Sequence, residues 1–267
     1  MAKWNLGGTR ILGAAFALLA SAGLVLVTRS PERPQFEARV YVGSGVERMP
    51  YRLYVPPGYD SRKRYPLVVW LHGSDAIGNN NLSQIAAYNT PGTQVWIRPD
   101  HQRDFPAIVV APQSAERYWA IPLLKEATLE ERLVFEIIAA LQQEFSIDAD
   151  RIYLAGQSMG GFGVWALLAR RPDLFAAGIV LCGPGVPIVV ERISHIPVWV
   201  FHGAKDDRVP VKDGRGMVEL LRKAGGQPRY TEYPDLGHAV GRAAFNEKDL
   251  LPWLFAQRRS AAHDPFR

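Results

Sequence analysis

Short and almost wholly apolar runs recur along this chain and alternate with segments whose apolar residues have helical spacing. The runs are 66–71, 107–111, 152–155, 178–181 and 198–201, and a less apolar one follows at 230–233. Runs of this kind are typical of parallel strands covered on both faces. The helical segments are 129–145, 161–171, 216–223 and 248–257. The alternation predicts a doubly wound α/β domain, in which a mostly parallel sheet has helices on both faces.

Two more strand-like segments precede this pattern. We expect Arg39–Val42 and Tyr51–Val55 to pair as edge strands, the second ended by two prolines and a glycine. The chain has 267 residues, of which 48% are hydrophobic and 21% charged, so it can bury a full-sized core. We place one folded domain at residues 36–260 and a short tail at 261–267.

The first 29 residues differ in composition from this domain. Lys3 and Arg10 precede an unbroken run of apolar and small residues from Ile11 to Val27. A charged start, an apolar middle and small residues at Ala20 and Ala22 resemble a secretory signal, yet the run also reaches the lower limit of a membrane span. We expect residues 1–29 to be a signal peptide or an N-terminal membrane anchor, and 30–35 a linker. The protein would then be periplasmic or secreted, or anchored to the membrane by this segment.

The strongest local motif is Gly156-Gln157-Ser158-Met159-Gly160, which lies between an apolar run and a helical segment. In that context it is typical of a nucleophile elbow, a strained strand-to-helix turn that exposes a serine hydroxyl. The serine backbone is expected at positive φ, and side chains at the two glycine positions would clash with the turn. The alternative is an ordinary glycine-rich turn. The motif predicts Ser158 as the nucleophile.

A serine nucleophile needs a base, and the base needs a third group that orients it. With this elbow, the chain order is serine, then acid, then histidine. Asp206 and Asp207 follow the run 198–201, and His238 follows the run 230–233. Both positions come just after strand ends, where α/β sheets carry their sites. We therefore expect His238 to be the general base, and these residues alone leave Asp206 and Asp207 both open as the acid.

The oxyanion of an acyl-transfer reaction needs two hydrogen-bond donors. We expect the backbone N–H groups of Met159, next to the nucleophile, and of Ser74, in the glycine-containing turn after the run 66–71, to supply them. Substrate contacts are expected from Gln157, Trp96 and Trp119, with Tyr118 as a further aromatic candidate. The alternative for the aromatic residues is packing in the core.

Four blocks of the sequence resemble the α/β-hydrolase superfamily, in the branch of predicted peptidases and phospholipase/carboxylesterase-type esterases, with feruloyl esterase-like and polyhydroxybutyrate depolymerase-like enzymes among the relatives. The blocks are 65–74, 151–161, 201–210 and 231–238. The resemblance implies an α/β-hydrolase fold and serine esterase chemistry. It also implies that the acid is Asp206, through the pattern that joins His202-Gly203 to Val209-Pro210. The chain departs from many relatives at 239–241, where aromatic residues are common.

These observations predict a serine hydrolase that cleaves small-molecule or polymeric carboxylic esters through an acyl-enzyme on Ser158. Only residues 183–197 connect the run that ends near Cys182 to the next one, little more than a parallel crossover requires, so we expect no large lid domain. A serine peptidase acting on peptides is the first alternative. A non-catalytic, anchored binding module is the second.

Other classes of function find less support in the sequence. His72 and His202 each precede a glycine after an apolar run and are interpreted as structural turn residues. No histidine or cysteine spacing is typical of a metal site, and Cys182 is the only cysteine. The net charge of +5 comes with no nucleic-acid motif, so we expect no nucleic-acid partner. No cofactor is implied.

Overall fold

The computed structural model describes residues 36–43, 47–121 and 126–259. The chain divides into two units, residues 1–33 and 34–267, and all of the described residues belong to the second. The signal or anchor, the linker and the tail expected from the sequence all lie outside the described residues. No helix in the described part of the chain is long and apolar enough to cross a membrane.

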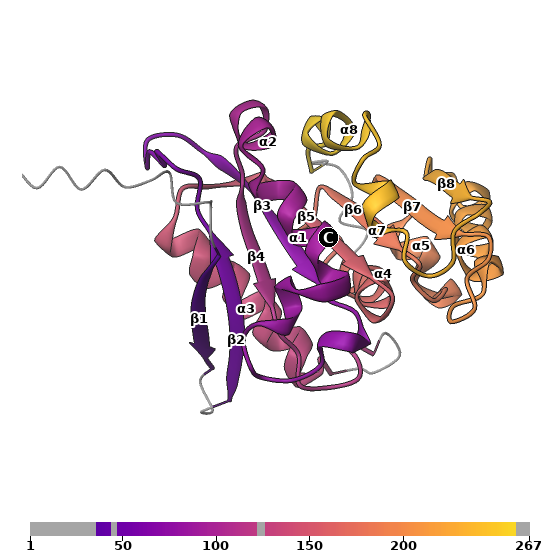
Figure 1. Ribbon diagram of the computed structural model, residues 1–267, viewed down its shortest axis with the longest axis horizontal. Helices are drawn as coiled ribbons and strands as arrows, with labels where there is room; N and C mark the ends of the chain where they lie inside the picture. The colour runs from indigo at the N-terminus through magenta and orange to yellow at the C-terminus, as the bar shows by residue number, and fades with distance from the viewer. Residues whose placement is uncertain (1–35, 44–46, 122–125, 260–267) are drawn as a thin grey trace, which may run out of the picture. The chain divides into compact units, whose positions relative to one another are not determined.

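The described strands form one eight-stranded sheet in the order β1-β2-β4-β3-β5-β6-β7-β8 (Figure 1). β2 pairs antiparallel with β1 and with β4, and all other neighbours are parallel. The strands are β1 (Glu37–Val42), β2 (Arg48–Tyr54), β3 (Tyr65–Leu71), β4 (Ile108–Pro112), β5 (Ile147–Gln157), β6 (Ala177–Leu181), β7 (Val198–Gly203) and β8 (Arg229–Tyr233). The doubly wound, mostly parallel sheet predicted from the alternation is confirmed. One detail differs: β2 is not an edge strand, because β4 covers its other side.

Helices pack on both faces of the sheet. One face buries residues of α3 (Leu129–Glu144), α4 (Met159–Arg170), α5 (Val190–Ile193) and α6 (Val211–Lys223). The other face buries residues of α1 (Thr90–Ile97), α7 (Gly241–Ala244) and α8 (Leu250–Ala256), and α2 (Pro99–Asp104) follows α1. Short 3-10 helices lie at η1 (Ser74–Ala76), η2 (Ser83–Ile85), η3 (Ala87–Asn89) and η4 (Pro187–Val189).

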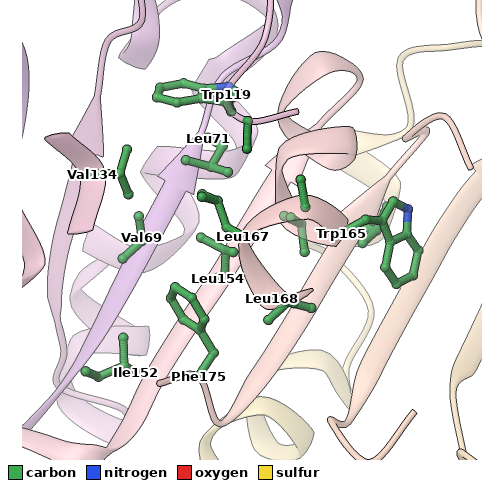
Figure 2. Close-up of a cluster of buried hydrophobic side chains, with 14 of the residues drawn as sticks. Val69, Leu71, Trp119, Val134, Ile152, Leu154, Trp165, Leu167, Leu168 and Phe175 are labelled. Atoms are coloured by element: carbon green, nitrogen blue, oxygen red, sulfur yellow. The ribbon is translucent and has the colours of Figure 1, made fainter. Parts of the chain in front are cut away.

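The core under α4 holds the strand that carries the elbow. Figure 2 shows Leu167 and Leu168 of α4 close to Leu154 of β5, and all three are completely buried. Burying each such side chain contributes about 1.5–3 kcal/mol. These contacts hold α4 firmly against β5.

The connection between β6 and β7 is short. Residues 182–197 contain only η4 and α5, so no lid domain is inserted between β6 and β7. The carboxyl ends of the parallel strands β3, β5, β6, β7 and β8 lie at the same edge of the sheet. The loops at this edge carry the chemical groups expected from the sequence.

Candidate active site

Ser158 occupies a strained turn between β5 and α4. Its φ is 56° and its ψ is −117°, a combination that a residue with a side chain rarely adopts. Its N–H donates to the carbonyl oxygen of Leu181 on β6 at 2.8 Å, which fixes the turn to the sheet. A Cβ at Gly156 would lie 2.4 Å from the carbonyl oxygen of Gly160, and one at Gly160 would lie 2.0 Å from that of Leu71. The turn therefore requires glycine at both positions, as its crowding predicted.

His238, in the loop after β8, contacts one of the two neighbouring aspartates. Its Nδ1 lies 2.8 Å from Oδ2 and 3.0 Å from Oδ1 of Asp206. Oδ1 also accepts the backbone N–H groups of Arg208 and Val209, each at 2.9 Å. The Asp206 side chain is completely buried, whereas Asp207 is exposed. Of the two candidates left open by the residues alone, Asp206 is the one that contacts His238.

The hydrogen bonds to Asp206 decide its protonation. Burial opposes ionisation of this carboxyl, but the donors from Val209, His238 and Arg208 outweigh burial and hold the pKa of Asp206 below its ordinary value. Asp206 is therefore an acceptor at neutral pH, so Nδ1 of His238 carries a hydrogen. Nε2 of His238 is then the ring nitrogen able to take up a proton.

Ser158 and His238 line the same cavity, of about 220 Å³, which we call the nucleophile cavity. Its remaining lining residues are Gly73, Ser74, Asp75, Tyr88, Gln157, Asp207, Arg208 and Ala239. In the described part of the chain, no hydrogen bond joins the Ser158 hydroxyl to the His238 ring. Contacts of this type are often long without a substrate and shorten when one binds.

A second, larger cavity of about 540 Å³ shares Ser74 with the first, and we call it the apolar cavity. Its other lining residues are Ile77, Arg117, Tyr118, Met159, Phe162 and Pro184. Ser74 begins η1 and Met159 begins α4. Neither backbone N–H donates to an acceptor among the described residues. Both are therefore free to bind an oxygen near Ser158.

The turn that carries Ser74 is fixed by buried groups. Nε2 of His72 accepts the N–H of Ser114 at 3.0 Å, so Nδ1 carries the hydrogen and donates it to the carbonyl oxygen of Gly73 at 2.7 Å. The amide oxygen of Asn89 accepts the Gly73 N–H at 3.2 Å. Burial lowers the pKa of His72 to about 4, so this ring is neutral at physiological pH. These bonds hold the Ser74 N–H in place.

Comparison with known proteins identifies the family. The model of the putative esterase family matches residues 45–188, more than half of the chain. The chain belongs to the putative esterase family. A prolyl oligopeptidase family model matches residues 189–256, which follow directly.

Relatives of this esterase-family chain agree with that assignment. A probable feruloyl esterase C of Aspergillus terreus is 28% identical over 178 residues, which cover 65% of this chain and 59% of that protein. A carboxylesterase of Arabidopsis thaliana is 24% identical over 207 residues, covering 70% and 88%. The crystal structure of a thermostable esterase is similar with a TM-score of 0.79 and 36% identity, covering 85% of this chain and 64% of that one. The chain thus spans less than two thirds of the first relative and of the solved structure. The α/β-hydrolase fold expected from the resemblance is confirmed.

Two aromatic residues of this esterase-family chain lie elsewhere than expected. Trp96 is 2% exposed and packs against Phe245, and Trp119 is completely buried, with its Nε1–H donating to the carbonyl oxygen of His72. Neither indole lines a cavity described above. The expectation that they contact substrate is wrong, and packing in the core accounts for both. Tyr118, by contrast, is 52% exposed and lines the apolar cavity.

Gln157 does line the nucleophile cavity beside Ser158. It is only 4% exposed, and its Oε1 is buried without a hydrogen-bond partner. Sequence reasoning missed Phe162 and Ile77 in the apolar cavity. Phe162 follows Met159 by three positions in α4, so the helical period could have placed it on the same side. Nothing local marks Ile77.

Sequence reasoning also missed a contact of His202, which it placed in a structural turn. Nε2 of His202 lies 3.3 Å from Oδ2 of Asp206. One ligand atom from each of Cys182, His202 and Asp206 lies within 4.8 Å of the others. The Cys182 thiol and Nε2 of His202 both lie against the Asp206 carboxylate.

Proposed function

We propose that this chain is a serine hydrolase that cleaves carboxylic esters, with Ser158, His238 and Asp206 as its catalytic triad. The observation that carries the proposal is the arrangement at the nucleophile cavity. His238 is bonded through Nδ1 to a buried carboxylate and lines the same cavity as a serine held at positive φ. Membership of the putative esterase family supports the same chemistry.

The proposed reaction proceeds through an acyl-enzyme. Nε2 of His238 takes the proton of the Ser158 hydroxyl while the oxygen attacks the ester carbonyl. The N–H groups of Met159 and Ser74 bind the oxyanion of the tetrahedral intermediate. His238 then gives its proton to the departing alcohol, and the C–O bond breaks. Water, deprotonated by the same nitrogen, attacks the acyl-enzyme and releases the carboxylic acid and Ser158.

The two cavities suggest where each half of the substrate binds. The departing oxygen must come within reach of His238, which lines only the nucleophile cavity, so we place the alcohol part there. That cavity offers the polar side chains of Asp75, Gln157 and Arg208. The acyl group would extend past Met159 and Ser74 into the apolar cavity.

The preferred substrate would accordingly join an apolar acyl group to a polar alcohol. At about 540 Å³ the apolar cavity is within the range of about 300–1,000 Å³ that is usual for small-molecule sites. Tyr118 and Phe162 give it aromatic walls, which suit an aromatic acyl group such as the feruloyl group in the name of the Aspergillus terreus relative.

A serine peptidase is the second candidate, because a prolyl oligopeptidase family model matches residues 189–256. That segment includes both Asp206 and His238. Amide cleavage uses the same triad but depends more on protonation of the leaving nitrogen. A matched pair of ester and anilide substrates with the same acyl group separates the two functions. We expect ester turnover with little or no anilide turnover, and faster anilide turnover would favour the peptidase.

We also propose that the chain acts outside the cytoplasm, with residues 1–29 as a cleaved signal or a retained anchor and 36–260 as the catalytic domain. The charged start and the apolar run from Ile11 to Val27 support this. Amino-terminal sequencing of the protein recovered from membrane and soluble fractions tests it. A new amino terminus just after Ala22 in the soluble fraction would identify a signal peptide.

A panel of aryl esters of graded acyl length, assayed with wild type and Ser158→Ala, tests the hydrolase proposal. Wild type should hydrolyse several of them and Ser158→Ala should lose at least about 10³-fold in kcat. Failure of wild type to hydrolyse any ester or anilide would leave the anchored binding module as the function.

A further inference from the structure

His202 is a completely buried histidine that the proposed reaction does not use. It lies near the end of β7, four residues before Asp206. Its Nε2 is 2.9 Å from the carbonyl oxygen of Val209 and 3.3 Å from Oδ2 of Asp206. Both neighbours are acceptors, so Nε2 carries a hydrogen and shares it between them.

The hydrogen on Nε2 of His202 contacts both the Asp206 carboxylate and the loop that binds this carboxylate. Oδ1 of Asp206 is fixed by N–H groups of Arg208 and Val209, which belong to its own loop. Oδ2 faces Nδ1 of His238 and has His202 as its second nitrogen donor. Because His202 also binds the carbonyl oxygen of Val209, one ring ties the carboxylate and its loop to the end of β7.

The His202 ring has little freedom to move. On its other side lies Gly214 of α6, where a Cβ would be only 2.7 Å from Nδ1 of His202. Gly216, two residues further along the same helix, has no atom within 4 Å of such a Cβ. Nδ1 is buried without a hydrogen-bond partner in the described residues, so nothing except packing and the Nε2 contacts orients the ring.

The thiol of Cys182 lies against the same carboxylate. Burial raises the pKa of this thiol, and the nearby Asp206 carboxylate adds to the rise, so it stays protonated. The Asp206 carboxylate is thus contacted by Nε2 of His202, by the Cys182 thiol and by Nδ1 of His238. Among the other charged groups nearby, Asp207 and Arg208 line the nucleophile cavity, and Lys205 pairs with Asp235. On β8, Glu232 lies in register with His202 and interacts with it electrostatically.

We propose that His202 is a positioning residue, whose Nε2–H holds the Asp206 carboxylate in the orientation in which it pairs with Nδ1 of His238. His202 does not touch substrate. Its effect on turnover rests on the proposed hydrolase function, but its effect on the Asp206–His238 pair does not. Without this donor the carboxylate can rotate about its Cβ–Cγ bond, and the imidazolium form of His238 loses part of its stabilisation.

Two variants test the contact between His202 and Asp206. Each places an amide side chain at position 202, and the two side chains differ in length. In His202→Gln the amide nitrogen can reach the place of Nε2, whereas in His202→Asn it reaches only the place of Nδ1. Each variant and wild type is assayed for kcat, KM and the acid limb of the pH profile of kcat/KM. The pKa of His238 is also measured by NMR, which needs no turnover. Thermal unfolding shows that each protein is folded.

We expect His202→Asn to lose about tenfold or more in kcat with KM unchanged, as removal of a group that orients a functional side chain usually does. The pKa of His238 and the acid limb should both move to lower pH. His202→Gln should retain most of kcat and the wild-type pKa. Equal losses in both variants with an unmoved His238 pKa would overturn the proposal, as would wild-type behaviour of His202→Asn or failure of both to fold.

Gly214→Ala and Gly216→Ala, on the same helix, test the position of the ring without changing His202. The first places a methyl group against Nδ1, so it should displace the ring and lower kcat and the His238 pKa in the same direction as His202→Asn. The second should leave both unchanged. Identical pKa values of His238 in the two alanine variants would contradict the proposal. If wild type hydrolyses no ester, the NMR results alone decide it, and the failure then belongs to the proposed function.

Discussion

Nδ1 of His238 lies 2.8 Å from Oδ2 of Asp206, while Asp207, the next residue, is exposed at the nucleophile cavity. The loop after β7 makes this difference between two adjacent carboxylates. It turns the N–H groups of Arg208 and Val209 toward Oδ1 of Asp206. These two hydrogen bonds offset the unfavourable burial of the charged carboxylate. Asp207 receives no such donors in the described residues and stays in contact with water.

These different environments predict that the same change, aspartate to asparagine, has a large effect on kcat at position 206 and a small one at position 207. Asp206→Asn should lose at least about 10³-fold in kcat, because the amide cannot hold His238 in the required tautomer. Asp207→Asn should change kcat by less than about threefold, because it removes an exposed charge. Steady-state kinetics on one aryl ester compares them. A larger loss in Asp207→Asn would move the acid one residue along the chain.

The apolar cavity should determine acyl preference. Ile77→Trp fills part of the cavity, so kcat/KM for an octanoate ester should fall by about tenfold or more, while that for the acetate ester of the same alcohol changes little. Val40→Trp, on the edge strand β1 and 50% exposed, is the control and should alter neither value. If Ile77→Trp lowered both esters equally, the acyl group would not occupy this cavity.

Burial of His72 should make the protein sensitive to mild acid. The folded protein keeps this ring neutral to about pH 4, whereas an unfolded histidine titrates near pH 6.5. The unfolded state therefore takes up the proton first, and stability falls as pH drops from about 6.5 toward 4. The contribution of His72 to the loss between pH 7 and pH 5 is about 2 kcal/mol.

Urea denaturation of wild type and His72→Gln at both pH values measures this contribution. Glutamine does not titrate, so the variant should lose about 2 kcal/mol less than wild type over the same interval. All other ionisable groups are common to both proteins and cancel in the comparison. The same loss in both would show that His72 does not carry the effect.

The turn that carries Ser158 is so closely packed that an added methyl group there should lower the free energy of unfolding. A methyl group at Gly160 would lie 2.0 Å from the carbonyl oxygen of Leu71, which is backbone and cannot rotate away. Gly160→Ala should therefore cost about 3 kcal/mol or more in the free energy of unfolding. Gly216→Ala meets open space in α6 and should be neutral or stabilise by up to about 1 kcal/mol. Equal stability of the two variants would contradict this geometry.

The strands and the elbow could be predicted because their signals are local. Strands covered on both faces are apolar throughout, and the elbow requires two glycines around one serine. Helices α1 and α2 were not predicted, because Pro91, Gly92 and Pro99 resemble helix breakers. Both prolines lie in the first turn of their helix, where the missing N–H costs nothing. A Cβ at Gly92 would lie 2.0 Å from the Trp70 ring, so that glycine serves packing.

The side chains around the site depend on contacts between distant segments and could not be assigned from local patterns. Trp96 and Trp119 are residue types found both in substrate pockets and in cores. Only the packing of Phe245 against Trp96 and of His72 against Trp119 shows that they belong to the core. His202 is separated from Asp206 by a turn whose N–H groups bind carbonyl oxygens of the segment after β8, at Tyr233 and Leu236. Its contact with the carboxylate becomes visible only when that loop is folded.

Labelling with a fluorophosphonate tests the central claim most directly, because this reagent forms a covalent adduct with an activated serine hydroxyl. Wild type and Ser158→Ala are treated in parallel, digested and analysed by mass spectrometry. The proposed triad predicts one adduct on the wild-type peptide that contains Ser158, and none on the variant. Equal labelling of both proteins, or an adduct at another serine, would remove Ser158 from the mechanism.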